Sequence, residues 1–134
     1  MQRVTFKLLI IALLCMLQGC ISFNSLADAK NAKGEGLVKE YRASKQEVWR
    51  ETLAIIRQSK LRLVDDNIDK GIILAQQPIA PLSLTVGQHV AIFLTDYKGI
   101  TRVEVVNKKA VGSIEFTSTD WEHYIVEALS KHFG

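Results

Sequence analysis

Two cysteines, Cys15 and Cys20, carry the only thiols of this chain of 134 residues. Both lie in an amino-terminal stretch that opens with two basic residues, has no acid before residue 20 and includes an uncharged run from Leu8 to Leu17. This run is too short for a membrane-spanning helix, which needs about 20 apolar residues. A basic start, a short apolar centre and a small residue at the end are typical of a secretory signal. The sequence therefore predicts that residues 1–19 are a signal peptide.

The residues Leu17-Gln18-Gly19-Cys20 resemble a bacterial lipobox, in which a leucine and then a small residue precede a cysteine. The resemblance implies that the Cys20 thiol receives a diacylglycerol, that the chain is cut before Cys20, and that the new amine is acylated. Cys15 follows Leu14, which is bulkier than the Gly, Ala or Ser of a lipobox, so Cys15 is expected to leave with the signal. An uncleaved anchor, or a buried helix with an incidental cysteine, is the alternative.

Lipidation of Cys20 predicts a permanent membrane partner. Each buried methylene contributes about 0.8 kcal/mol, and a single myristoyl chain binds only marginally, so three chains would hold the protein at a bilayer. Ile21 follows the cysteine. The resemblance to enteric lipoproteins implies retention in the inner membrane when Asp stands there, so Ile21 favours the outer membrane over the inner one. The domain would then face the periplasm.

The composition of the mature chain excludes several classes of protein. Cleavage before Cys20 leaves 115 residues with 15 basic and 14 acidic side chains. Nucleic-acid binding needs a dense basic patch, and no such patch is present in the sequence, so no nucleic-acid partner is expected. No thiol remains for a disulfide, so a domain of this size must fold by burial alone.

Hydrophobic periodicity divides the mature chain into a lipidated cysteine with a flexible tether, residues 20–35, and a folded domain, residues 36–134. The capping box Ser44–Glu47 predicts a helix to about Lys60, and a second box, Thr119–Glu122, predicts a final helix from Trp121. Alternation and turn residues predict strands at Leu37–Ala43, Leu61–Val64, Ile72–Ala75, Thr85–Leu94, Ile100–Val106 and Val111–Thr117.

This order, β-α-β-β-β-β-β-α, predicts an α+β fold. We expect a two-layer sandwich in which an antiparallel sheet of about five to six strands carries two helices on one face. Strands 72–75 and 90–94 are apolar on both faces, although antiparallel sheets usually alternate. Something is therefore expected to cover the second face: the loop after residue 77, a second copy, a partner or a lipid.

Several segments resemble small proteobacterial lipoproteins of unassigned function with a single BamC-like, helix-grip domain. The residues that carry the likeness are Tyr41–Trp49 opening a helix, the turn and strand Asp69–Ile73, the strand Gly99–Val105 and the amphipathic final helix. BamC is an accessory lipoprotein of the outer-membrane β-barrel assembly machinery. It has two such domains and a long amino-terminal segment, whereas this chain has one domain and a short tether. The resemblance covers residues 36–133 and carries over no functional residues.

Other candidate chemistry is weak. The alternation Asp65-x-Asn67-x-Asp69 matches the start of a calcium loop, but the positions that need Gly and Glu hold Lys70 and Gln76, so a hairpin turn is the better interpretation. The three histidines share no ligand spacing, and no nucleophile elbow is present. Glu104 is expected to pair with Arg102 or a lysine. We expect no catalytic residue, no metal site and no cofactor.

The leading hypothesis is a non-catalytic docking or accessory module that binds another envelope protein. It would present a sheet face or the apolar loop that contains Pro78, Ile79, Pro81, Leu82 and Leu84. The alternative is a carrier or sensor that holds a lipid or small apolar ligand between sheet and helix, as helix-grip sheets can.

Overall fold

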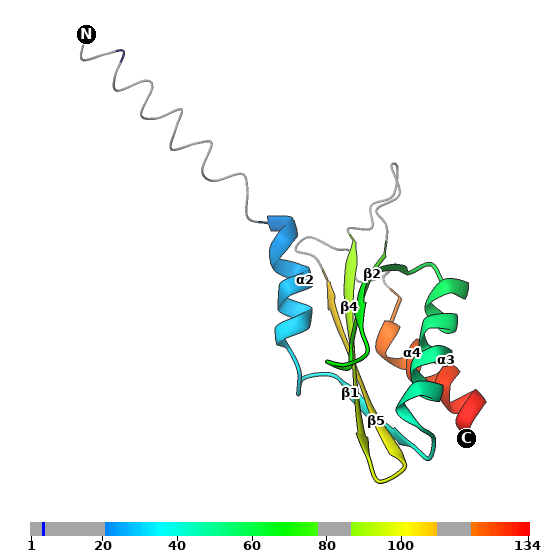
Figure 1. The fold of residues 1–134 in the computed structure, drawn as a ribbon. Coiled ribbons are helices and arrows are strands. Elements are labelled where there is room, and N and C mark those ends of the chain that lie inside the picture. The colour runs from blue at the N-terminus through cyan, green and yellow to red at the C-terminus, as the bar shows by residue number, and fades with distance from the viewer. Residues whose placement is uncertain (1–3, 5–20, 78–86, 110–118) are drawn as a thin grey trace.

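The structure is a computed structural model that describes Val4 and residues 21–77, 87–109 and 119–134, with residues 21–25 as backbone only. Its elements are, in chain order, α2 (Ile21–Asn31), β1 (Leu37–Tyr41), α3 (Lys45–Gln58), β2 (Arg62–Asn67), β3 (Ile72–Gln76), β4 (Gln88–Tyr97), β5 (Ile100–Lys109) and α4 (Trp121–Phe133). The strands form one antiparallel sheet in the order β1-β5-β4-β3-β2. Figure 1 shows α3 and α4 on one face of this sheet and α2 on the other. The predicted α+β sandwich with two helices on one face is confirmed; the strand predicted at Val111–Thr117 lies outside the described residues.

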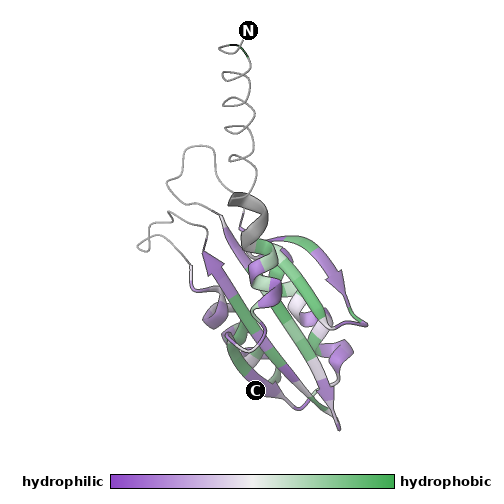
Figure 2. Ribbon diagram, turned by 90° about the vertical axis from the view of Figure 1, so that its left-hand side faces the viewer, coloured by the Kyte–Doolittle hydropathy of each residue, from purple (hydrophilic) through white to green (hydrophobic). Residues whose placement is uncertain are grey.

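The apolar second face of the sheet is explained by α2. Along β4, Val90 and Ile92 belong to the core under α3 and α4, whereas Ala91 and Phe93 belong to a separate apolar cluster with Ala29 of α2. Alternate residues of a strand point to opposite faces, so both sets can be apolar only because both faces are covered. Figure 2 shows α2 lying across strands whose hydropathy is high where the helix crosses them.

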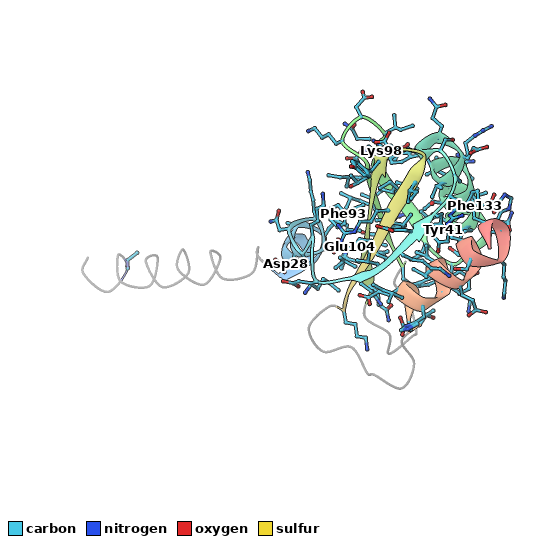
Figure 3. All side chains as sticks on the ribbon, turned by 90° about the horizontal axis from the view of Figure 1, so that it is seen from below. Asp28, Tyr41, Phe93, Lys98, Glu104 and Phe133 are labelled. Carbon is cyan, nitrogen blue, oxygen red and sulfur yellow. The ribbon has the colours of Figure 1, made fainter. Side chains whose placement is uncertain are left out.

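The expectation of a flexible tether over residues 20–35 is corrected by this helix. Leu26, Ala29 and Ala32 recur every three residues, which places them on one side, and Ala29 and Ala32 are buried against the sheet. Viewed from below, Phe93 and Glu104 lie on the α2 side of the sheet, and Tyr41 and Phe133 on the opposite side (Figure 3). The folded unit therefore begins well before Gly36.

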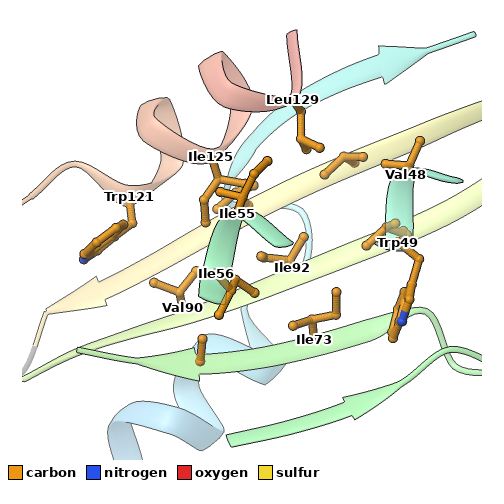
Figure 4. Packing of buried hydrophobic residues seen from close by; sticks show 14 of the residues in the cluster. Val48, Trp49, Ile55, Ile56, Ile73, Val90, Ile92, Trp121, Ile125 and Leu129 are labelled. Atoms are coloured by element: carbon orange, nitrogen blue, oxygen red, sulfur yellow. The ribbon is translucent and has the colours of Figure 1, made fainter. Parts of the chain in front are cut away.

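The main core lies between the sheet and the pair α3 and α4. Ile56 of α3 and Ile125 and Leu129 of α4 pack over Val90 and Ile92 of β4 (Figure 4), and all are at most 1% exposed. The two helices cover a single continuous apolar surface, as their amphipathic stripes predict.

The start of α3 confirms the first capping box. The Ser44 hydroxyl accepts from the Glu47 backbone N–H, and the Glu47 carboxylate accepts in return from the Ser44 backbone N–H at 3.0 Å. The second box is different: the N-cap of α4 is Asp120, which accepts from the His123 N–H. Glu122 instead accepts from the backbone N–H of Asn107 on β5, so a tertiary contact displaces the local one.

Two tight turns close the hairpins as predicted. Lys98 and Gly99 have φ values of 48° and 78°, the left-handed pair that suits a two-residue hairpin between β4 and β5. In the β2–β3 turn the Asn67 side chain accepts from the Lys70 N–H, which confirms the predicted turn. The strand predicted at Ile100–Val106 is longer in the structure, because β5 continues to Lys109 by pairing with the first residues of β4.

Candidate functional site

The end of the sheet at which α2 begins gathers several elements, and we call it the anchor end. Ile21, the first residue of α2, directly follows the predicted lipidation position. Figure 1 shows the start of α2 at the same end as the start of β4 and the end of β5, where Gln88 pairs with Lys109. The opposite end, which we call the hairpin end, carries the turn between β4 and β5. The candidate site is therefore the region in which the segment after Cys20 attaches to the folded domain.

Glu104 fixes the segment that follows α2 onto the sheet. Its side chain is on β5 and the residue is 2% exposed. The carboxylate accepts from the backbone N–H of Gly34 and from that of Gly36, the latter at 3.2 Å. A buried carboxylate needs such partners, because removing its charge from water is costly. The expectation that Glu104 pairs with Arg102 or a lysine is wrong, since backbone donors take that place.

Three further features hold the same segment close to the sheet. The Lys108 ammonium of β5 lies 2.7 Å from the Glu35 carboxylate, and this hydrogen bond raises the pKa of Lys108. The Lys33 ammonium lies 5.8 Å from the centre of the Phe93 ring, within range of a cation–π contact. A Cβ at Gly36 would stand 2.2 Å from the Val105 carbonyl oxygen, so only glycine fits. The link between α2 and β1 is therefore built to lie flat on β5.

Polar side chains close the core at the anchor end. The Trp121 indole donates to the Gln77 side chain, and the Asn107 amide donates to the Gln88 side chain, each at 3.2 Å. These bonds tie the start of α4 to β3, and β5 to β4. Gln88 is 1% exposed, and neither its Nε2 nor the Oδ1 of Asn107 has a partner within the described part of the chain. Burial also lowers the pKa of His89, on the other side of β4.

The histidines near the carboxyl terminus make surface pairs. His123 Nδ1 lies 2.7 Å from Asp120, and Glu127, one turn further along α4, pairs with Lys131 at 3.0 Å. Partial burial alone would raise the pKa of Asp120, but the hydrogen bonds from His123 together lower it. In the described ranges no group of three or more His, Cys, Asp or Glu side chains is placed to hold a metal ion.

The sequence-predicted site residues lie outside the described residues. These are Cys20, the lipobox residues Leu17, Gln18 and Gly19, and the loop residues Pro78, Ile79, Pro81, Leu82 and Leu84. Gln77 and Gly87, which flank that loop, lie at the anchor end next to Gln88. None of the helices described is long and apolar enough to cross a membrane.

Glu104 is the residue that sequence reasoning misjudged. It is the only acid in the run Val103–Val106, and Val106, on the same face of β5, is buried. Strand alternation next to a buried valine signals a carboxylate that is itself buried, but the partners come from a segment 70 residues away.

Comparison with known families gives no relative: no family model matches the chain, and no curated protein matches it.

Proposed function

We propose that the chain is a lipid-anchored envelope lipoprotein whose domain is a non-catalytic docking module. In this proposal Cys20 carries the lipid, the outer membrane holds the anchor and the domain faces the periplasm. The observation that carries it is α2: the residue after Cys20 begins a helix that Glu104 and its glycine partners fasten to the domain. A domain fastened this close to its anchor is suited to presenting a surface at a fixed place beside the membrane.

The proposed partner is another envelope protein. Because α2 covers the apolar part of the second sheet face, that face is a weaker docking candidate than the sequence suggested. The loop with Pro78, Ile79, Pro81, Leu82 and Leu84 is the remaining candidate, since its composition is apolar and its flanks lie at the anchor end. The likeness to single-domain BamC-like lipoproteins stays part of this proposal; the described order is α2-β1-α3-β2-β3-β4-β5-α4, and the predicted strand 111–117 lies outside the described residues.

One observation favours the alternative, a carrier or sensor of a small ligand. The amides of Gln88 and Asn107 are buried where the sheet meets α4, and each leaves one polar atom without a partner in the described residues. A ligand that offers both an acceptor and a donor would satisfy them. Native mass spectrometry of the purified protein discriminates, because a co-purifying mass of lipid size supports the carrier and its absence supports docking.

Metabolic labelling with an alkyne fatty acid tests the anchor. The native chain is expected to incorporate label and to fractionate with membranes, because three acyl chains bind a bilayer durably. Cys20→Ser should abolish the label, and the matched control Cys15→Ser should keep it. A Cys20→Ser protein that still partitions wholly into membranes would contradict the proposal.

Photo-crosslinking in intact cells tests docking. A photoreactive residue at Ile79 or Leu82 is expected to capture one discrete envelope protein. The same residue at Tyr97, which is 68% exposed at the hairpin end, serves as the control. A blank at both loop positions counts against the docking loop.

A further inference from the structure

We propose that the anchor end carries a basic rim, formed by Lys60, Arg62 and Lys109, that rests on anionic phospholipid headgroups. The rim would orient the domain so that the hairpin end points away from the membrane. This inference rests on the proposed lipid anchor and goes beyond it, because an anchor by itself fixes a position and not an orientation.

Helix α2 holds the anchor end close to the proposed lipid anchor. From Ile21 to Leu26, the first residue of α2 whose side chain is described against the sheet, the helix rises about 8 Å at 1.5 Å per residue. A flexible tether over residues 20–35 could instead have extended to roughly 50 Å. The folded helix thus holds the anchor end within about one Debye length of the headgroups, which is roughly 8 Å at physiological ionic strength.

The three basic residues of the rim lie at the same end of the sheet. Lys60 follows the end of α3, Arg62 begins β2 and Lys109 ends β5, and all three are exposed. Arg62, through Gln76 and His89, lies in one cross-strand row with Lys108, directly beside the pair Gln88 and Lys109. The three residues therefore come from separate elements and meet the same end of the sheet.

The acidic residues near the rim have other partners. Glu35 is paired with Lys108, which Asp28 also faces. Asp120 is paired with His123, and Glu122 accepts from a backbone N–H of β5. Among the described residues none of these acids forms an ion pair with the rim. Within the described part of the chain, the three positive charges therefore have no ion-pair partner.

The two turns at the hairpin end, Asp65–Lys70 and Asp96–Lys98, are acidic, with four acids and two lysines. Beside them stand Lys45, next to Gly71, and Arg42, which follows β1. An anionic surface would attract the anchor end and repel these turns, so charge and tether length favour one orientation.

Headgroup quenching measures this orientation directly. The only cysteine predicted in the mature chain is the lipidated one, so a fluorophore can be attached to Gln58→Cys at the anchor end or to Lys98→Cys at the hairpin end. Each lipidated protein is placed in vesicles of phosphatidylcholine and phosphatidylglycerol that contain a headgroup nitroxide lipid. We expect quenching at position 58 to exceed that at position 98 several-fold. Equal quenching, or stronger quenching at position 98, overturns the inference.

Charge reversal tests the rim itself. Lys60→Glu, Arg62→Glu and Lys109→Glu together should weaken the oriented state by at least about 100-fold, since each basic residue near an anionic surface contributes roughly fivefold. The quenching ratio should then approach one, as it should in vesicles of phosphatidylcholine alone. The matched control reverses Lys45, Lys70 and Lys131 and should keep the ratio. A ratio that survives reversal of the rim overturns its role, with circular dichroism verifying that each variant is folded.

Intact mass spectrometry before reconstitution separates the two possible failures. A protein without lipid on Cys20 overturns both the anchor and the orientation that rests on it. A lipidated protein with equal quenching at positions 58 and 98 overturns the orientation alone.

Discussion

The two faces of the sheet are both apolar, yet they are covered in different ways. Under α3 and α4, large side chains such as Ile56, Ile125 and Leu129 interdigitate with those of the strands. Under α2, the apolar side chains described in the contact are those of Leu26 and Ala29 and of Ala32 just after the helix, and part of the fastening is polar, through Glu104. The first face is built as a core, and the second as an attachment.

The two faces therefore have different roles: one supplies most of the folding free energy, and the other sets where the chain enters the domain. Burial of large apolar side chains supplies most of the free energy of folding. The buried side chains described under α2 are those of alanines, so directional bonds at the end of the helix have a larger part in holding it. The second face can thus set where the chain enters the domain without contributing a large share of the folding free energy.

The largest contrast is expected from truncating one apolar side chain on each face. Ile125→Ala should lower the free energy of unfolding by about 2–5 kcal/mol, because Ile125 is fully buried. Leu26→Ala should cost less than about 1 kcal/mol, because Leu26 is only partly buried. Urea unfolding measures both. Equal losses would show that α2 belongs to the main core.

A smaller effect is expected from the bond that fastens α2. Glu104→Ala removes the charged acceptor of two backbone donors, but Gly34 is exposed and its N–H can bond to water, so we expect a loss of about 1.5–3 kcal/mol, the contribution of one hydrogen bond to a charged group. Amide hydrogen exchange should therefore accelerate over residues 26–36, while α4 is unchanged. Glu104→Gln retains an acceptor oxygen and serves as the control. Acceleration spread evenly over α2 and α4 would contradict a local fastening.

The smallest effect is expected on the pH dependence of stability, through the N-terminal cap of α3. The backbone and hydroxyl of Ser44 donate to Glu47 and lower the pKa of that carboxyl below its ordinary value of 4.5. Since the folded-state pKa is lowered, the stabilisation is present above pH 4.5 and is lost as the pH falls through the lower value. Thermal unfolding of the native protein and Glu47→Gln should differ at pH 7 and converge near pH 3. A constant difference would show that the carboxyl does not act through its charge.

The sequence was sufficient where the signal is local. The capping box at Ser44, the apolar stripe of α4 and the left-handed turn at Lys98 and Gly99 each depend on residues a few positions apart. Those features fixed the helix pair and the hairpins, and with them the α+β class.

The sequence was insufficient where a contact spans the chain. The segment 21–31 mixes small and polar residues with Ile21, Phe23 and Leu26, without a sustained period, so its helix is recognisable only once the sheet buries Ala29. Glu104 shows the same limit, because its donors at Gly34 and Gly36 are distant in the chain. The cap of α4 moved from Thr119 to Asp120 because β5 engages Glu122.

The irregular edge of the sheet at β2 has a consequence if the protein is anchored to a membrane, as proposed. The register shifts between Leu63 and Asp65, and the exposed carboxylates of Asp65 and Asp66 follow. A bulged, charged border is a poor template for a strand from another chain. Molecules that share a bilayer surface collide often, and this edge would disfavour strand pairing between neighbouring molecules and hence aggregation.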